Sequence, residues 1–189
     1  MTSDYFGQAF ESLKKAVSPA EALYGVKKSK PTIDYTKNNY GVRADSSVDD
    51  VANYLLDRLG SHESANNYAA DRGLITPGQS ASGKYQYIDS TWNNYKGYKR
   101  AVDAPPEIQE ERMRADILAN LARFQGDPFK TVAYHYYPAY AERPELWQQR
   151  LVDKNGKPLP DQQSIAEYLS KVFPKERVEG YLASLGATR

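Results

Sequence analysis

The fold expected for this chain depends on the stretch Leu59-Gly-Ser-His-Glu-Ser-Ala-Asn-Asn-Tyr68, where an amphipathic helix runs into a polar loop. Upstream, the apolar residues that share one helical face are Val48, Val51, Ala52, Leu55 and Leu59. Ser47, followed three residues later by Asp50, resembles a capping box, so we expect the helix to begin there. Four residues after Leu59 comes Glu63, whose carboxylate therefore continues the apolar stripe.

A carboxyl group in this position is suited to acid–base chemistry. At the edge of an apolar face Glu63 is partly desolvated, and the negative end of the helix dipole lies close by. Both effects favour the protonated form, which a general acid needs near neutral pH. The alternative is an ordinary exposed glutamate in a frayed last turn, and periodicity alone does not decide between the two.

Three motifs follow Glu63-Ser64 along the chain: Gly83-Lys-Tyr-Gln86, Ser90-Thr-Trp92 and Ala133-Tyr-His-Tyr-Tyr-Pro138. In order and spacing they resemble the lytic transglycosylase and goose-type lysozyme superfamily. That family carries a Glu-Ser pair at a helix end, a Gly-x-x-Gln turn, a Ser/Thr-containing helix start and a late Ala-Tyr-Asn-Ala-Gly-Pro run. The resemblance covers residues 48 to 147. The chain departs from the family at His135, which replaces Asn, and at Tyr137, which replaces Gly.

The resemblance implies a mainly α, lysozyme-like α+β fold, with a small β-element beside a cleft. It implies cleavage of the β-1,4 bond between N-acetylmuramic acid and N-acetylglucosamine in peptidoglycan, with Glu63 as general acid and then base. The substrate-binding residues that it implies are Ser64, Tyr85, Gln86 and Tyr134, with Tyr134 beside Glu63. In lytic transglycosylation the sugar's own C6 hydroxyl closes a 1,6-anhydro ring, so we expect no metal or other cofactor.

A hydrolytic muramidase is the alternative, and it would use a second carboxylate, for which Asp71 and Asp89 are the candidates. Asp89 also suits the N-cap of a helix that begins near Ser90, and this structural role is the favoured one. Trp92 is expected in the core, and His135 is expected to face solvent without a chemical role. Two hypotheses without catalysis stay open: a structural virion or tail protein with a degenerate cleft, and a module that binds glycan without cutting it.

Composition bears on partners and location. The 189 residues carry a net charge of +1, which gives no reason to expect a nucleic-acid partner, and they include no cysteine and only two histidines. The first residues lack the basic and apolar regions of a signal peptide, and no run of about eighteen apolar residues predicts a membrane span. Because peptidoglycan lies outside the cytoplasmic membrane, we expect a phage particle to carry the protein and deliver it to the host periplasm and cell wall during genome entry.

Three parts are expected along the chain: an arm or linker at 1–47, a lysozyme-like domain at 48–150 and a helical extension at 151–189. Further helices are expected from Pro106 to Phe124, from Pro128 to Pro138, and at 141–151, 161–172 and 174–185, with a short strand at Leu74-Ile75. The arm contains an amphipathic pattern at 4–17. We expect the terminal arms to contact other virion or tail proteins; the alternative is a tail or a segment packed on its own domain.

Overall fold

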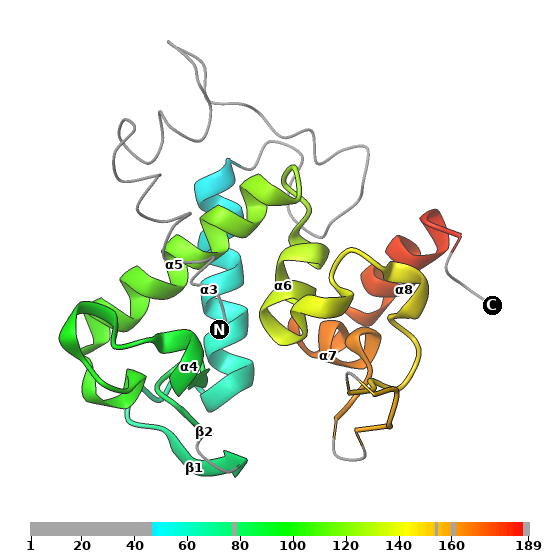
Figure 1. The fold of residues 1–189 in the computed structure, drawn as a ribbon. Coiled ribbons are helices and arrows are strands. Elements are labelled where there is room, and N and C mark those ends of the chain that lie inside the picture. The colour runs from blue at the N-terminus through cyan, green and yellow to red at the C-terminus, as the bar shows by residue number, and fades with distance from the viewer. Residues whose placement is uncertain (1–46, 77–78, 154, 160–161, 187–189) are drawn as a thin grey trace.

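The computed structural model describes residues 47–76, 79–153, 155–159 and 162–186, so the predictions for residues 1–46 lie outside the described part. Its α-helices are α3 (Val48–Ser64), α4 (Asp89–Trp92), α5 (Pro106–Arg123), α6 (Pro128–Tyr136), α7 (Ile165–Val172) and α8 (Lys175–Ser184). Its strands are β1 (Asp71–Thr76), β2 (Gln79–Ser82) and β3 (Tyr87–Ile88), which form an antiparallel sheet in the order β1-β2-β3. The expected class, mainly helical with a small β-element, is confirmed (Figure 1).

Helix α3 begins and ends as its local sequence predicts. The Asp50 backbone N–H donates to the Ser47 hydroxyl (3.2 Å), and the Ser47 backbone N–H donates to the Asp50 carboxylate (2.8 Å), which confirms the capping box. Leu55 and Leu59, from the apolar stripe, are fully buried. At the other end Ala65 adopts the left-handed conformation (φ 54°) and its N–H donates to the Ser61 carbonyl, which ends the helix directly after Ser64.

Helices α5 and α6 each have proline in the first turn, where its missing N–H costs nothing. Helix α5 packs along α3 through a buried face that includes Met113, Ile117 and Leu121. Helix α6 is capped by Asp127, whose side chain accepts from the Lys130 N–H (3.0 Å), and it ends shortly before Pro138 as predicted. In Figure 1, α6 lies between the α3–α5 pair and the C-terminal helices.

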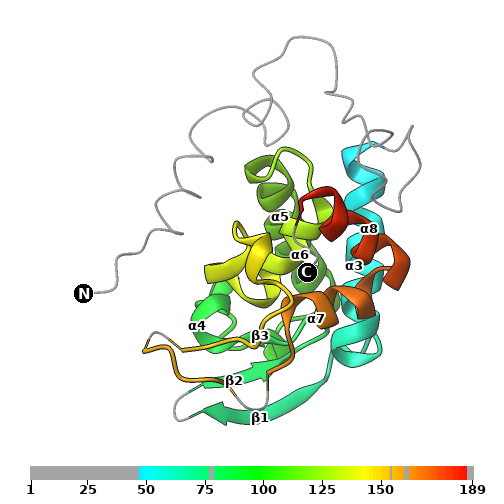
Figure 2. The ribbon, with the colours of Figure 1, turned by 90° about the vertical axis from the view of Figure 1, so that its right-hand side faces the viewer.

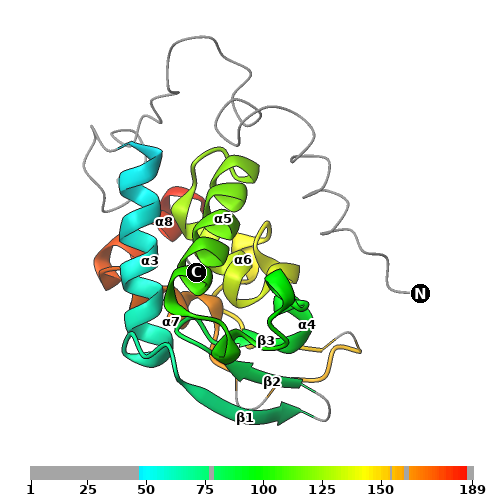
Figure 3. The ribbon, with the colours of Figure 1, turned by 90° about the vertical axis from the view of Figure 1, so that its left-hand side faces the viewer.

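The sheet lies beside the C-terminal end of α3 (Figures 1 and 3). The strand expected at Leu74-Ile75 is the middle of the longer β1, which pairs Leu74 with Ser80 of β2. Strand β2 then pairs Ala81 with Ile88 of β3. The turn between β2 and β3 is the Gly83–Gln86 motif, so the fold places this motif in a tight hairpin.

The C-terminal helices belong to the same hydrophobic core as α3. Leu169 and Val172 of α7 are fully buried in the cluster that contains Leu55 of α3, and Leu182 of α8 is buried in it as well. Figure 2 shows α7 close to α3 and α6, in agreement with the contacts between these helices. The C-terminal helices and α3 therefore share one hydrophobic core.

The prediction of a helix at 141–151 is wrong. One 3-10 turn, Pro138–Tyr140, comes just before this segment, and the segment itself contains a second one, Pro144–Leu146. Proline lacks an N–H and disfavours helical dihedrals in the residue before it; Arg143, with φ −125° and ψ 63°, shows this effect. The segment is nevertheless well packed, because Trp147 is fully buried and its Nε1 donates to the Tyr140 carbonyl (2.8 Å).

Candidate active site around Glu63

Side chains from three helices meet at the carboxylate of Glu63. Glu63 stands in the last turn of α3, and 14% of its side chain is exposed. The hydroxyl of Tyr168, from α7, donates a hydrogen bond to Glu63 Oε1. Nε2 of His135, from α6, lies 3.9 Å from the same oxygen. The site therefore depends on residues that lie far apart in the sequence.

His135 does not face solvent, so that prediction is wrong. Only 19% of its side chain is exposed, and its ring packs edge-on to Tyr87 with the centroids 6.5 Å apart. Burial lowers the pKa of His135, although the charges of Glu63 and Asp116 act in the opposite direction. The imidazole is therefore neutral near neutral pH. At 3.9 Å it is also beyond direct hydrogen-bonding distance of Glu63, so the two do not form an ion pair.

Tyr168 is held between two other rings. Tyr136 stacks on it with the centroids 4.1 Å apart and the planes 7° from parallel. His62 contacts it edge-on at 5.0 Å and 73°. Burial, followed by the charge of Glu63, raises the pKa of Tyr168 well above its ordinary value, so its hydroxyl remains a donor.

Ser64 connects the end of α3 to the Gly83–Gln86 turn. Its hydroxyl donates to the Lys84 carbonyl (2.8 Å) and accepts from the Asn67 N–H (3.0 Å). Two hydrogen bonds within the protein occupy the Ser64 hydroxyl. Ser64 therefore connects the helix end to the turn. The same hydrogen bond links the Glu-Ser motif to the Gly-x-x-Gln motif.

The turn itself is tightly built around Gly83 and Gln86. Gly83 has φ +76°, and a Cβ there would lie 2.6 Å from Oε1 of Gln109, which accepts from the Lys84 N–H (2.8 Å). Gln86 also has positive φ (49°), and its Nε2 donates to the Gly83 carbonyl (2.9 Å). Gln86 Oε1 is enclosed and has no hydrogen-bond partner among the described residues.

Within the turn, Tyr85 and Lys84 join a partly buried polar cluster with Tyr68 and Glu110. Tyr85 is 1% exposed, and its hydroxyl donates to Glu110 Oε2 (2.7 Å), so it has no surface to offer a glycan. Lys84 Nζ lies 2.7 Å from Glu110 Oε1, and the Tyr68 hydroxyl donates to the same oxygen. The prediction that Tyr85 binds substrate is not supported, because its position is that of a core residue.

The predicted position of Tyr134 beside Glu63 is also not supported. Tyr134 packs at the C-terminal end of α5, with its ring centroid 5.7 Å from that of Phe124 and 4.8 Å from the Arg123 guanidinium carbon. Successive residues of an α-helix point about 100° apart. The side chain that turns toward Glu63 is consequently that of the next residue, His135.

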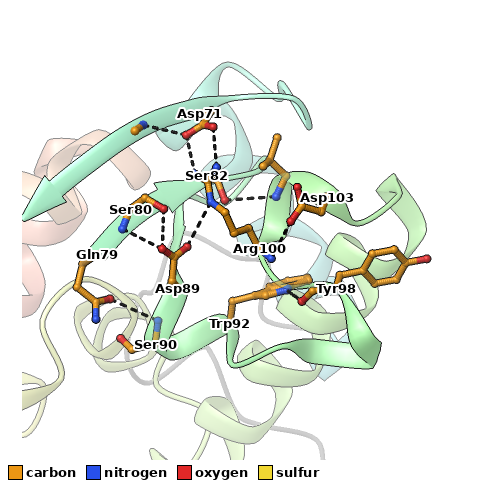
Figure 4. Close-up of polar contacts among 12 residues, drawn as sticks. Asp71, Gln79, Ser80, Ser82, Asp89, Ser90, Trp92, Tyr98, Arg100 and Asp103 are labelled. Carbon is orange, nitrogen blue, oxygen red and sulfur yellow. Dashed lines mark hydrogen bonds and ion pairs between the residues drawn. The ribbon is translucent and has the colours of Figure 1, made fainter. Parts of the chain in front are cut away.

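The two candidate second carboxylates share a different partner, Arg100 (Figure 4). Arg100 donates to both oxygens of Asp71 (2.7 and 2.9 Å), and its Nε lies 3.5 Å from Asp89 Oδ1. The hydrogen bonds from Arg100 and from the Gly73 N–H lower the pKa of Asp71 to about 2. Asp89 accepts from the Ser80 hydroxyl (2.7 Å) and N–H (3.1 Å), and these bonds lower its pKa as well.

Asp89 is not the N-cap that the sequence suggested. The N-cap of α4 is Ile88, and Asp89 is the first helical residue, with its carboxylate reaching back to β2. Trp92 lies in the core as expected, fully buried, with Nε1 donating to the Tyr98 carbonyl (2.8 Å). Arg100 therefore has a structural role: through Asp71 and Asp89 it connects the β1–β2 hairpin to α4.

Tyr168 and His135 are the site residues that the sequence interpretation missed, although both have a periodic signal. Tyr168 lies three residues after Ile165 on the apolar face of α7, and His135 lies three residues after the buried Val132 on α6. Spacing could thus have placed both side chains inward. It could not have shown that they meet the same carboxylate.

No family model, curated protein or solved structure matches this chain. Within the described ranges, no three His, Cys, Asp or Glu side chains gather in a way that could hold a metal ion. In the same part of the chain, no helix has the length and apolar character that crossing a membrane requires.

Proposed function

We propose that this protein is a peptidoglycan lytic transglycosylase that cleaves the β-1,4 bond between N-acetylmuramic acid and N-acetylglucosamine. The observation that carries the proposal is the carboxyl group of Glu63, which is mostly buried at a helix end and held at one oxygen by Tyr168. The ordered motifs at Glu63-Ser64 and Gly83–Gln86 support it, because the Ser64–Lys84 bond joins them into one structural unit.

Glu63 acts twice in the proposed reaction. As an acid it gives its proton to the glycosidic oxygen while the bond from that oxygen to C1 of N-acetylmuramic acid breaks. As a carboxylate it then takes the proton of the C6 hydroxyl, whose oxygen attacks C1 and closes the 1,6-anhydro ring. The proton lost in the first step returns in the second, and no water is consumed.

The arrangement of carboxylates favours transglycosylation over hydrolysis. An inverting or retaining hydrolase needs a second carboxylate across the cleaved bond. Arg100 binds both Asp71 and Asp89, and the interactions described for Glu63 include no second carboxylate. Asp116, which interacts electrostatically with His135, is bound to Arg112 and to the Tyr87 hydroxyl.

Gln86 is the remaining substrate-binding candidate from the motifs. An enclosed acceptor without a partner is unfavourable, and Gln86 Oε1 is such an acceptor among the described residues. A sugar hydroxyl or acetamido N–H would complement it if the side chain rotated toward the ligand. Ser64 contributes indirectly, by holding the turn that carries Gln86.

The test is mass spectrometry of soluble products from purified peptidoglycan, with wild type, Glu63→Gln and Glu142→Gln as the three proteins. Glu142 is an exposed glutamate paired with Arg123, so its substitution is a matched control. We expect products one water lighter than reducing-end muropeptides from wild type and Glu142→Gln, and none from Glu63→Gln. Reducing-end products would indicate a muramidase, and no release by the wild type would refute the enzymatic proposal.

Two other hypotheses make different predictions in the same experiment. A glycan-binding module would sediment with peptidoglycan without releasing fragments, and a structural virion protein would do neither. Delivery by a phage particle and contacts of the terminal arms with virion or tail proteins stay predictions. The N-terminal arm, up to residue 46, lies outside the described part of the chain.

A further inference from the structure

We infer that His135 confines glycan cleavage to pH values at which its imidazole is neutral, because a positive charge at this position opposes the reaction in two ways. The inference rests on the proposed function of Glu63. It concerns a position at which the chain departs from the family that it resembles, since His135 stands where that family carries Asn. An asparagine amide takes up no proton in the pH range where histidine titrates.

His135 interacts with two carboxylates that come from different helices. Its Nε2 is 3.9 Å from Oε1 of Glu63, in α3, and Asp116 of α5 acts on it electrostatically. Only 19% of the His135 side chain is exposed, and its ring packs edge-on to Tyr87 of β3. Water therefore screens the interaction between His135 and Glu63 only in part.

The other ionisable side chains in contact with this pair or with its partners are His62, Tyr87, Arg112 and Tyr168. Asp116 is compensated, because Arg112 binds it (3.0 Å) and the Tyr87 hydroxyl donates to it (2.6 Å). Among the described residues Glu63 has no Lys or Arg within 4 Å, so a protonated His135 would be its nearest cation. His62 also acts electrostatically on Glu63 and His135, which makes it the group to compare with His135.

A protonated His135 would oppose cleavage through both the acid and the sugar. An imidazolium 3.9 Å from Glu63 Oε1 favours the carboxylate form, so Glu63 holds less readily the proton that the first step needs. The transition state of glycoside cleavage carries positive charge on the sugar ring, and a second positive charge beside the acid raises its energy. A neutral imidazole has neither effect.

Burial of the ring lowers the pKa of His135, while the charges of Glu63 and Asp116 act in the opposite direction. The imidazolium therefore forms on the acid side of the ordinary histidine range. If Glu63 were the only titrating group, the cleavage rate would level off at low pH, because a fully protonated acid gains nothing further. With His135 beside it, the rate should fall again as the pH drops.

The test uses the two histidines of the chain, whose imidazole resonances are assigned by their loss in His135→Asn and in His62→Asn. Release of 1,6-anhydro products from peptidoglycan is measured over the same pH range, with each protein normalised to its own maximum. We expect the acid limb of the wild type to coincide with the His135 titration. It should move toward lower pH by about one unit or more in His135→Asn and stay in place in His62→Asn. Circular dichroism at each pH checks that the proteins are folded.

Glu63→Gln measures the coupling of the two groups without any need for activity. The Glu63 charge favours the imidazolium, so its removal should move the His135 titration to lower pH by about one unit or more. Glu142→Gln is the matched control, because Glu142 is exposed and paired with Arg123, and it should leave the His135 titration unchanged. An unchanged His135 titration in Glu63→Gln would overturn the inference.

An acid limb that stays in place in His135→Asn, or that follows His62 instead, would overturn the inference even if the wild type is an active transglycosylase. Coupling in Glu63→Gln, together with no product from the wild type at any pH, would refute the proposed function and leave the pairing of His135 with Glu63 intact. If His135→Asn does not fold, the wild type decides. An acid limb that differs from its His135 titration by more than about one pH unit would then overturn the inference.

Discussion

Replacing Gly60 with alanine tests how tightly the end of α3 is fitted to the Gly83–Gln86 turn. Alanine is favoured over glycine inside a helix by about 1 kcal/mol, so propensity alone predicts stabilisation. At Gly60, however, a Cβ would lie 2.3 Å from Lys84 Cε and 2.7 Å from Asn66 Oδ1. One of these two side chains must move to make room for the Cβ. Lys84 is held in place, because its Nζ is paired with Glu110 at 2.7 Å.

The magnitudes decide the sign of the effect. Displacing Lys84 from Glu110 loses hydrogen bonds to a charged group, which are worth about 1.5–3 kcal/mol, and the added methyl costs about 1–3 kcal/mol in overpacking. Glu110 keeps 33% of its side chain exposed, so water offsets part of the loss and the lower values apply. With the propensity gain subtracted, we expect Gly60→Ala to lower the free energy of unfolding by about 2 kcal/mol and Tm by about 4–8 °C.

The control for this prediction is Gly180→Ala in α8. Gly180 is exposed, and a Cβ built there meets nothing within 4 Å, so only helix propensity acts. We expect it to raise Tm by about 2–4 °C. Thermal and denaturant unfolding monitored by circular dichroism measure both variants. If Gly60→Ala is stabilised as much as Gly180→Ala, the argument that Lys84 and the turn are rigidly placed against α3 is refuted.

Two further predictions concern ionisable groups. Burial lowers the folded-state pKa of His135 below its unfolded value, so its contribution to stability is complete above about pH 6.5 and is lost as the pH falls below that. His135→Asn should therefore flatten the fall in unfolding free energy as the pH drops below about 6.5, and an unchanged slope would contradict this. Asp71→Asn should leave glycan cleavage within about twofold of wild type and lower Tm only slightly, because an exposed ion pair such as Asp71–Arg100 contributes little to stability. A hundredfold loss of product release would instead restore Asp71 as a second catalytic carboxylate.

The parts of the fold that could be predicted are those with local causes. The capping box of Ser47 and Asp50 fixed the start of α3, and proline at the first positions of α5 and α6 marked their starts. The helix expected at 141–151 is absent for a local reason as well, because Pro144 lies within this segment and begins a 3-10 turn there. Spacing and caps therefore carry most of the secondary structure.

The candidate site also combines contacts that a local motif can predict with contacts that depend on the whole fold. Ser64 and the Gly83–Gln86 turn are twenty residues apart and meet through one hydrogen bond, so a short motif can describe their geometry. The partner of Glu63 is 105 residues away on a helix that packs against α3 only in the finished core. The resemblance, which ends at residue 147, pointed to Tyr134 for a place that His135 and Tyr168 occupy.

The distant origin of the Tyr168 hydroxyl matters because the late motif, Ala133–Pro138, differs from that of the family. For the role proposed for Glu63, a hydrogen-bond donor at one carboxylate oxygen is useful wherever in the sequence it comes from, and an element that packs against the end of α3 can supply it. In this chain α7 supplies that donor, and Tyr134 packs against Arg123 and Phe124. His135, where the family carries Asn, fills the space between Glu63 and Tyr87 with a ring that stays neutral near neutral pH, while Tyr168 donates the hydrogen bond to Glu63.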